Sequence, residues 1–137
     1  MNVGAESLRT QLYYLGIAHL LTHEMDAVKH AEWRLLFGLR ALGDAVAYPI
    51  FLLLHVPVVM LLFWLAHHPR EGLREGFRAA TAGFLLIHAA IHLHVSGSPG
   101  YGFDSPASSL LIFGAALAGI AYGALTVARR RMEDASR

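Results

Sequence analysis

Long uninterrupted apolar runs dominate this chain. Residues 45–66 carry no formal charge, and neither do residues 79–95 or 105–128. Each run approaches the roughly 20 residues that an α-helix needs to cross the hydrocarbon layer of a membrane. An earlier run over residues 10–22 is shorter and needs its polar flank to complete a span. The pattern therefore predicts an all-α fold, a four-transmembrane-helix bundle with up-down-up-down topology. The four predicted spans cover approximately residues 6–30, 44–67, 72–96 and 105–131.

Polar and turn-forming residues separate these runs. Residues 67–72 (HHPREG) and 96–106 (SGSPGYGFDSP) are rich in Pro, Gly and Ser, so neither segment can be helical throughout. Residues 31–43 (AEWRLLFGLRALG) are amphipathic, with Trp33 as an aromatic anchor, which predicts a short helix at the membrane interface. We expect one integral membrane domain over residues 1–137. A soluble bundle is the alternative, but the second and fourth helices lack the polar face that it would need.

The basic residues predict the orientation of the spans. Eight of the 11 Lys and Arg residues fall on one side of the predicted membrane, and three fall on the other. Cytoplasmic loops carry the excess of basic residues, so both termini are expected in the cytoplasm. The three outer basic residues, which lie between residues 29 and 40, weaken this bias.

Composition narrows the classes of function. The 137 residues are 55% hydrophobic and 15% charged, whereas soluble domains carry about 25% charged residues. A net charge of +1 without a basic stripe gives no case for nucleic-acid binding. The chain has no cysteine, which excludes disulfides and thiolate metal sites. The unusual number is nine histidines in so apolar a chain.

The histidines of three predicted spans can be brought together. Each helical residue turns by about 100°. Four residues of the first predicted span therefore fall within an arc of about 60°, namely His19, His23, Asp26 and His30. The alternating directions of the helices then place His55 of the second span and His88 and His92 of the third at matching depths, in the outer half of the membrane. Glu24 lies off the first-span stripe and is a weaker candidate. The predicted metal ligands are His19, His23, Asp26, His30, His55, His88 and His92.

Imidazole and carboxylate without sulfur suit a transition metal, with zinc or iron favoured and copper also compatible. The first predicted helix reads His-Glu-Met-Asp, and His23 has no histidine four residues later, so the HExxH protease motif is absent. We interpret the chain as a membrane metal-binding protein. The pattern is also compatible with a metal-dependent hydrolase or oxidoreductase acting on a membrane-soluble or periplasmic substrate. It does not decide whether the protein is an enzyme.

Other interpretations remain open. Two histidines on different helices could hold haem b for electron transfer, although Asp26 and His30 would then be surplus. The fourth helix has a small-residue face (Gly114, Ala118 and Ala121) that could pack within the bundle, in a homo-oligomer or in a larger membrane complex with the chain as an accessory subunit. The histidines could also form interhelical hydrogen bonds or a proton route.

The chain resembles a family of small, uncharacterised bacterial integral membrane proteins. The matching segments are THEMDAVKHAEWRLL, YPIFLLLHVPVV, IHAAIHLH and YGFDS, which together extend over most of the chain. The resemblance implies the four-span fold, a bacterial cell with the spans in its inner (cytoplasmic) membrane, and a set of matching positions, and it implies no activity. Those positions are His23, Glu24, Asp26, Glu32, Trp33, His55, Pro57, His88 and His92.

Overall fold

The computed structural model describes residues 3–136, and all the regular structure in this range is helical. Two single-turn 3₁₀ helices, η1 and η2, lie between the first two long helices. The four long helices agree closely with the predicted ranges, so the all-α prediction is confirmed. The elements are α1 (Val3–Lys29), η1 (Glu32–Arg34), η2 (Leu39–Ala41), α2 (Asp44–Ala66), α3 (Glu71–Val95) and α4 (Pro106–Ala135).

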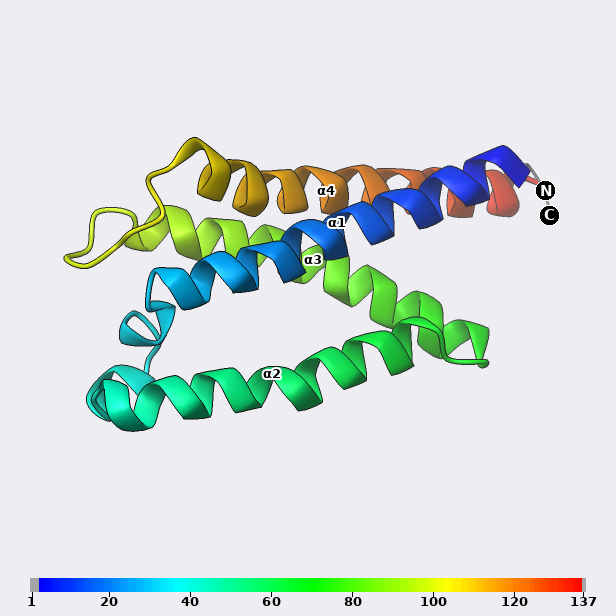
Figure 1. Cartoon of the computed structure of the whole chain (residues 1–137). Helices are drawn as coiled ribbons and strands as arrows, with labels where there is room; N and C mark the ends of the chain where they lie inside the picture. The colour runs from blue at the N-terminus through cyan, green and yellow to red at the C-terminus, as the bar shows by residue number, and fades with distance from the viewer. Residues whose placement is uncertain (1–2, 137) are drawn as a thin grey trace.

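Three of the long helices form a tight group, and the fourth lies to one side (Figure 1). Helix α1 packs mainly on α4, and α4 also packs along α3. Helix α2 contacts α3 and the 3₁₀ turns but exposes most of its apolar side chains. The η1–η2 segment and the α3–α4 loop lie at one end of the molecule, and the α2–α3 turn lies at the other.

Glycines permit the close approach of α1, α3 and α4. A Cβ atom on Gly16 of α1 would lie 2.8 Å from Cδ1 of Leu85 in α3. A Cβ atom on Gly119 of α4 would lie 2.8 Å from the backbone oxygen of Ala82 in α3. Small residues of this kind let helix backbones pack closely where a larger side chain would hold them apart.

Local sequence explains where α4 begins and why α2 continues. The Ser105 side chain accepts a hydrogen bond from the backbone N–H of Ser108, and Pro106 occupies the first turn of α4. Helix α2 runs through Pro49 and Pro57, each of which removes one backbone N–H donor. Prolines inside helices are more readily accommodated in membrane proteins than in soluble ones.

Three helices, α2, α3 and α4, are long and apolar enough to cross a membrane. Among the described residues α1 does not join them, although its 27 residues are sufficient in length. The reason is its composition, since Glu6, Arg9, Glu24 and Asp26 interrupt its apolar positions. The structure thus supports three of the four predicted spans.

The segment over residues 31–43 differs from its prediction. The expected amphipathic helix is replaced by η1 and η2, because the backbone repeatedly leaves the helical region. Ala31, Gly38 and Gly43 have φ angles of 54°, 92° and 67°. Such positive values end a right-handed helix and cost least at glycine. The correct element is therefore a pair of tight turns.

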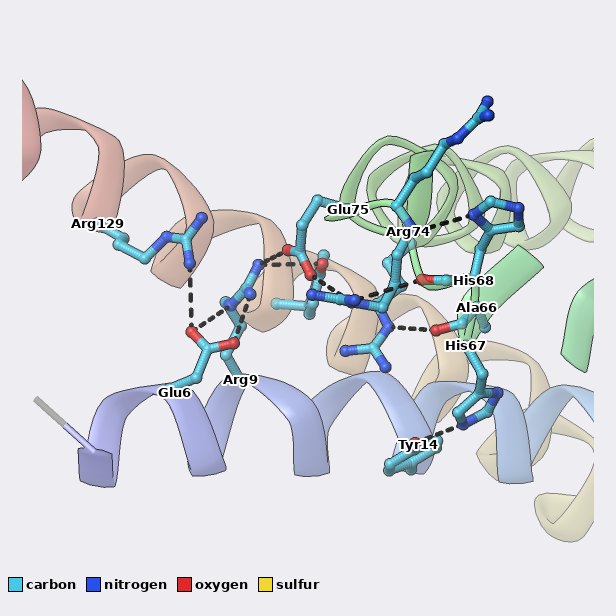
Figure 2. Close-up of polar contacts among 12 residues, drawn as sticks. Glu6, Arg9, Tyr14, Ala66, His67, His68, Arg74, Glu75 and Arg129 are labelled. Carbon is cyan, nitrogen blue, oxygen red and sulfur yellow. Dashed lines mark hydrogen bonds and ion pairs between the residues drawn. The ribbon is translucent and has the colours of Figure 1, made fainter. Parts of the chain in front are cut away.

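A polar network joins the helices at the end remote from η1 (Figure 2). Arg9 of α1 is 2% exposed, and its Nη1 lies 2.5 Å from Oε2 of Glu75 in α3 and 3.2 Å from the Tyr122 hydroxyl in α4. Its Nη2 donates to Oε1 of Glu6 at 2.7 Å. Arg78 of α3 donates to the backbone oxygen of Ala66, at the end of α2, at 3.0 Å. The network thus connects all four helices.

Candidate metal centre

Three histidines and one glutamate converge where α1, η1 and α3 meet. Their ligand atoms all lie within 4.8 Å of one another, which is close enough for a single ion to contact all four. We call this set the His/Glu cluster. Its histidines are 0–9% exposed, and the Glu32 side chain is 13% exposed. The cluster consists of His23, Glu32, His88 and His92.

Helical geometry positions the three imidazoles. His88 and His92 are four residues apart on α3, so they project from the same face in successive turns. Their ring centroids lie 4.6 Å apart, and the ring of His23 on α1 lies 4.8 Å from each of them. Gly16, one of the close-packing glycines, holds α1 near α3 on the same side of the helix.

Glu32 reaches the cluster because α1 ends just before it. Ala31 adopts the left-handed conformation (φ 54°, ψ 47°), which turns η1 back toward α3. Oε2 of Glu32 then lies 3.5 Å from Nε2 of His23, and Oε1 lies 3.7 Å from Nε2 of His92. The carboxylate therefore lies between imidazoles of two different helices.

The start of α2 anchors η1 in this position. The Trp33 indole N–H donates to Oδ1 of Asp44 at 3.0 Å, and the Arg34 guanidinium pairs with both oxygens of the same carboxylate. Trp33 also packs against Phe51 of α2, with ring centroids 5.7 Å apart. These contacts fix the residue that follows Glu32, and so they restrict the position of the Glu32 side chain.

Several polar atoms of the cluster are buried without a hydrogen-bond partner among the described residues. They are both ring nitrogens of His23, Nδ1 of His88 and Oε2 of Glu32. A buried polar atom left unpaired costs about 1–3 kcal/mol, so native proteins rarely accumulate several of them in one place. A cation at the centre would bind one nitrogen of each imidazole and the Glu32 carboxylate together, and the second nitrogen of His23 would keep its proton. The donor set thus fits a metal ion.

The carboxylate of Glu32 is suited to remain charged. Burial is the largest influence and raises its pKa, but the neighbouring imidazoles of His23, His92 and His88 together outweigh burial. The pKa of Glu32 is consequently lowered below the ordinary value of 4.5. A carboxylate that stays ionised near neutral pH is available as a ligand for a cation.

The structure brings three of the seven predicted ligands together: His23, His88 and His92. His19 lies outside the cluster, because its Nδ1 lies 2.9 Å from the Leu15 backbone oxygen and its ring fills the space beside Gly114 of α4. His55 also lies outside it and contacts Oε2 of Glu24 through Nε2 at 2.8 Å. Glu24, set aside in the sequence, thus faces α2.

Asp26 and His30 form a separate contact next to the cluster. Nε2 of His30 lies 3.3 Å from Oδ1 of Asp26, and the Ser108 hydroxyl donates to Oδ2 of Asp26 at 2.6 Å. The His30 ring also packs on Phe103, with centroids 5.1 Å apart. The pair therefore holds the end of α1 against α4 and the loop before it.

Helical periodicity did not identify Glu32 as a ligand. Only the family resemblance included it among the matching positions. It follows His23 by nine residues, and nine steps of about 100° would place it on the opposite face of a continuous helix. Only the break at Ala31 brings the two side chains together. No glycine or proline at Ala31 signals that break in the sequence.

Comparison with known proteins gives one match. The family described as "Family of unknown function (DUF6713)" matches residues 9–129, a range that includes all four cluster residues. No curated protein and no solved structure matches the chain. Because the family match covers most of the sequence, the chain belongs to the DUF6713 family, whose function is unknown.

Proposed function

We propose that this chain is an integral membrane protein that binds one transition-metal ion at the His/Glu cluster. The observation that carries the proposal is the convergence of buried, unpaired ligand atoms from three separate segments. Hydrogen-bonded packing alone would leave fewer of these nitrogens without a partner. A metal ion would bind one nitrogen of each histidine and supply Lewis-acid or redox chemistry.

The donor set favours zinc or iron. Three imidazoles and one carboxylate contain no sulfur, and zinc is commonly held by histidine and carboxylate ligands. Four protein ligands would complete a tetrahedral zinc site and make it structural. Iron(II) accepts more ligands, so the same four residues would leave positions open for a substrate. The coordination number therefore separates a structural role from an enzymatic one.

The proposed topology has four spans in a bacterial inner membrane, with both termini in the cytoplasm. Three apolar helices and the distribution of basic residues support it. The polar residues of α1 do not oppose a fourth span, because Arg9 is paired with Glu6 and Glu75 inside the helix group. In this topology the cluster lies in the outer half of the membrane.

An enzymatic role, as a hydrolase or oxidoreductase on a membrane-soluble or periplasmic substrate, would be an extension of metal binding.

Haem b receives less support, since the rings of His23 and His88 contact each other and a porphyrin would have to separate them. The accessory-subunit role also receives less support. Its key residues Gly114 and Ala118 pack against His19 and Gly16 of the same chain.

Elemental analysis and an absorption spectrum of the full chain, purified in detergent without chelators, test the proposal. We expect about one equivalent of zinc or iron, as for a single four-ligand site. His88→Ala should lose most of the metal, whereas His94→Ala, on the same helix but outside the cluster, should retain it. Less than half an equivalent, unchanged by His88→Ala, would overturn the proposal. A Soret band would instead establish the haem alternative.

A further inference from the structure

An apolar cavity of about 350 Å³ lies between α1, α2 and α3, directly beside the His/Glu cluster. Glu32, His88 and His92 form part of its wall. Most of the remaining wall is aliphatic or aromatic, including Leu20, Leu54, Val58 and Phe84. A mainly apolar cavity with a few convergent polar groups is the usual form of a small-molecule site.

The loop end of the cluster is closed. Phe103 of the α3–α4 loop is 2% exposed, and its ring lies 5.3 Å from that of His23 and 5.0 Å from that of His92. The Tyr101 hydroxyl lies 3.3 Å from Nδ1 of His92 on the same side. A ligand approaching from the loop would have to displace both aromatic side chains.

The helix side is accessible instead. Leu54 and Val58 of α2 and Ile91 of α3 line the cavity, and all three are more than half exposed. Both helices are apolar enough to cross a membrane, so in that setting these side chains border hydrocarbon. The cavity would then be reached from within the lipid layer.

A polar pair marks the cavity wall apart from the cluster. Nε2 of His55 lies 2.8 Å from Oε2 of Glu24, and each side chain is 27% exposed. The pair spans α1 and α2, which otherwise contact each other little. Ionisable groups between membrane helices are costly and usually mark a functional site.

We propose that this cavity binds a lipid-soluble alcohol, with an apolar body and one uncharged hydroxyl head group, and holds that hydroxyl beside the cluster. The inference rests on the proposed function, because it takes the cluster as the metal site. The Glu24 carboxylate is a suitable acceptor for the hydroxyl proton. The polar groups facing the head are Glu24, Glu32, His55, His88 and His92. A divalent cation at the cluster would balance the charges of the two carboxylates, so no surplus positive charge is left to pair with an anionic head such as that of a fatty acid.

Photolabelling of the full chain in phosphatidylcholine vesicles tests this inference. The probe is dodecanol bearing a diazirine on its chain, and mass spectrometry maps the labelled residues. Leu54→Trp fills the cavity, whereas Leu53→Trp adds the same side chain at a neighbouring α2 position that does not line it. We expect labelling at the cavity wall, displaced by excess dodecanol and not by dodecanoate. Leu54→Trp should reduce it several-fold and Leu53→Trp should not.

Two results would overturn the inference. One is labelling spread evenly over exposed α2 and α4 side chains and not displaced by dodecanol. The other is equal loss of labelling in Leu54→Trp and Leu53→Trp. The metal content of the same samples separates this inference from the proposed function. A protein with metal but without displaceable labelling overturns the inference alone, whereas displaceable labelling without metal overturns the proposed function.

Discussion

Nε2 of His23 and Oε2 of Glu32 lie 3.5 Å apart across the end of α1, and both atoms are buried. This distance is too long for a good hydrogen bond, and neither atom has another partner among the described residues. The two atoms are therefore placed to share an ion more readily than to bond to each other.

The charge of Glu32 should accordingly be required for tight metal binding. Glu32→Gln keeps the size of the side chain but removes the negative charge that offsets the cation. Loss of an outer-shell partner lowers metal affinity by roughly 10–100-fold, so loss of a charged ligand should cost at least as much. Competition with a chromophoric chelator measures the change. Glu71→Gln, at an exposed position on α3, is the control, and an equal affinity in both variants would contradict the prediction.

Metal affinity should fall as the pH is lowered from about 8 to about 5, because imidazole binds a metal only when it is neutral. The expected slope is about tenfold per pH unit for each histidine that must lose a proton. Glu32 should not contribute in this window. Its pKa is lowered, so its charge is present above the ordinary value of 4.5 and is lost only below the lowered pKa.

Chelator competition at a series of pH values tests this assignment. Glu32→Gln should bind metal more weakly at every pH but keep the same slope above about pH 5. A wild-type affinity that stays constant down to about pH 5 would show that no ligand histidine is protonated in this window and would contradict the prediction.

The contact between Asp26 and Ser108 should stabilise the α3–α4 loop more than it strengthens metal binding. Ser108→Ala removes the 2.6 Å hydrogen bond and leaves a part-buried carboxylate oxygen unpaired. Hydrogen bonds to charged groups contribute about 1.5–3 kcal/mol. We expect faster amide hydrogen exchange over residues 96–106 and a smaller loss of metal affinity than in His23→Ala. Ser109→Ala, at the next position of α4, is the control, and a larger loss of metal than in His23→Ala would contradict the prediction.

The network at the opposite end should stabilise the helix group independently of the metal. Glu75→Ala leaves the buried Arg9 without the acceptor that it contacts at 2.5 Å. Breaking a buried ion pair by removing the only partner typically costs about 3–5 kcal/mol, and the loss here should be smaller because Arg9 keeps its contact with Glu6. Thermal unfolding in detergent should therefore occur at a clearly lower temperature, with unchanged metal stoichiometry in the folded protein.

A second variant tests whether charge is the cause. Replacing both partners, in Arg9→Met with Glu75→Leu, should restore much of the lost stability, because no buried charge is then left unpaired. A double variant as unstable as Glu75→Ala would point to packing in place of charge.

The sequence predicts the long helices well because they depend on local composition. The charge-free runs over residues 45–66, 79–95 and 105–128 match α2, α3 and α4 within a few residues, apart from the more polar ends of α3 and α4. Periodicity also identifies the side of α3 that carries His88 and His92, because both histidines lie on one uninterrupted helix.

The ligand set is harder to predict, because it depends on which neighbours a helix face meets. Helix α1 lies against both α3 and α4, so its polar stripe is divided between them. His23 contacts His88 of α3, whereas His19 lies beside Gly114 of α4 and Asp26 bonds to Ser108 of α4. An arc of about 60° is wide enough to contact two neighbours, and helical arithmetic cannot tell which residue meets which.

The assembly of the cluster from three segments also sets an order of events during synthesis. A nascent chain that ends after α2 contains His23 and Glu32 but lacks both histidines of α3. Two ligands alone hold a transition metal weakly, so at the proposed site the ion can be captured only after α3 has packed against α1. Metal acquisition would then report the packing of α3 against α1, and it would distinguish a chain that has passed this step from one arrested before it.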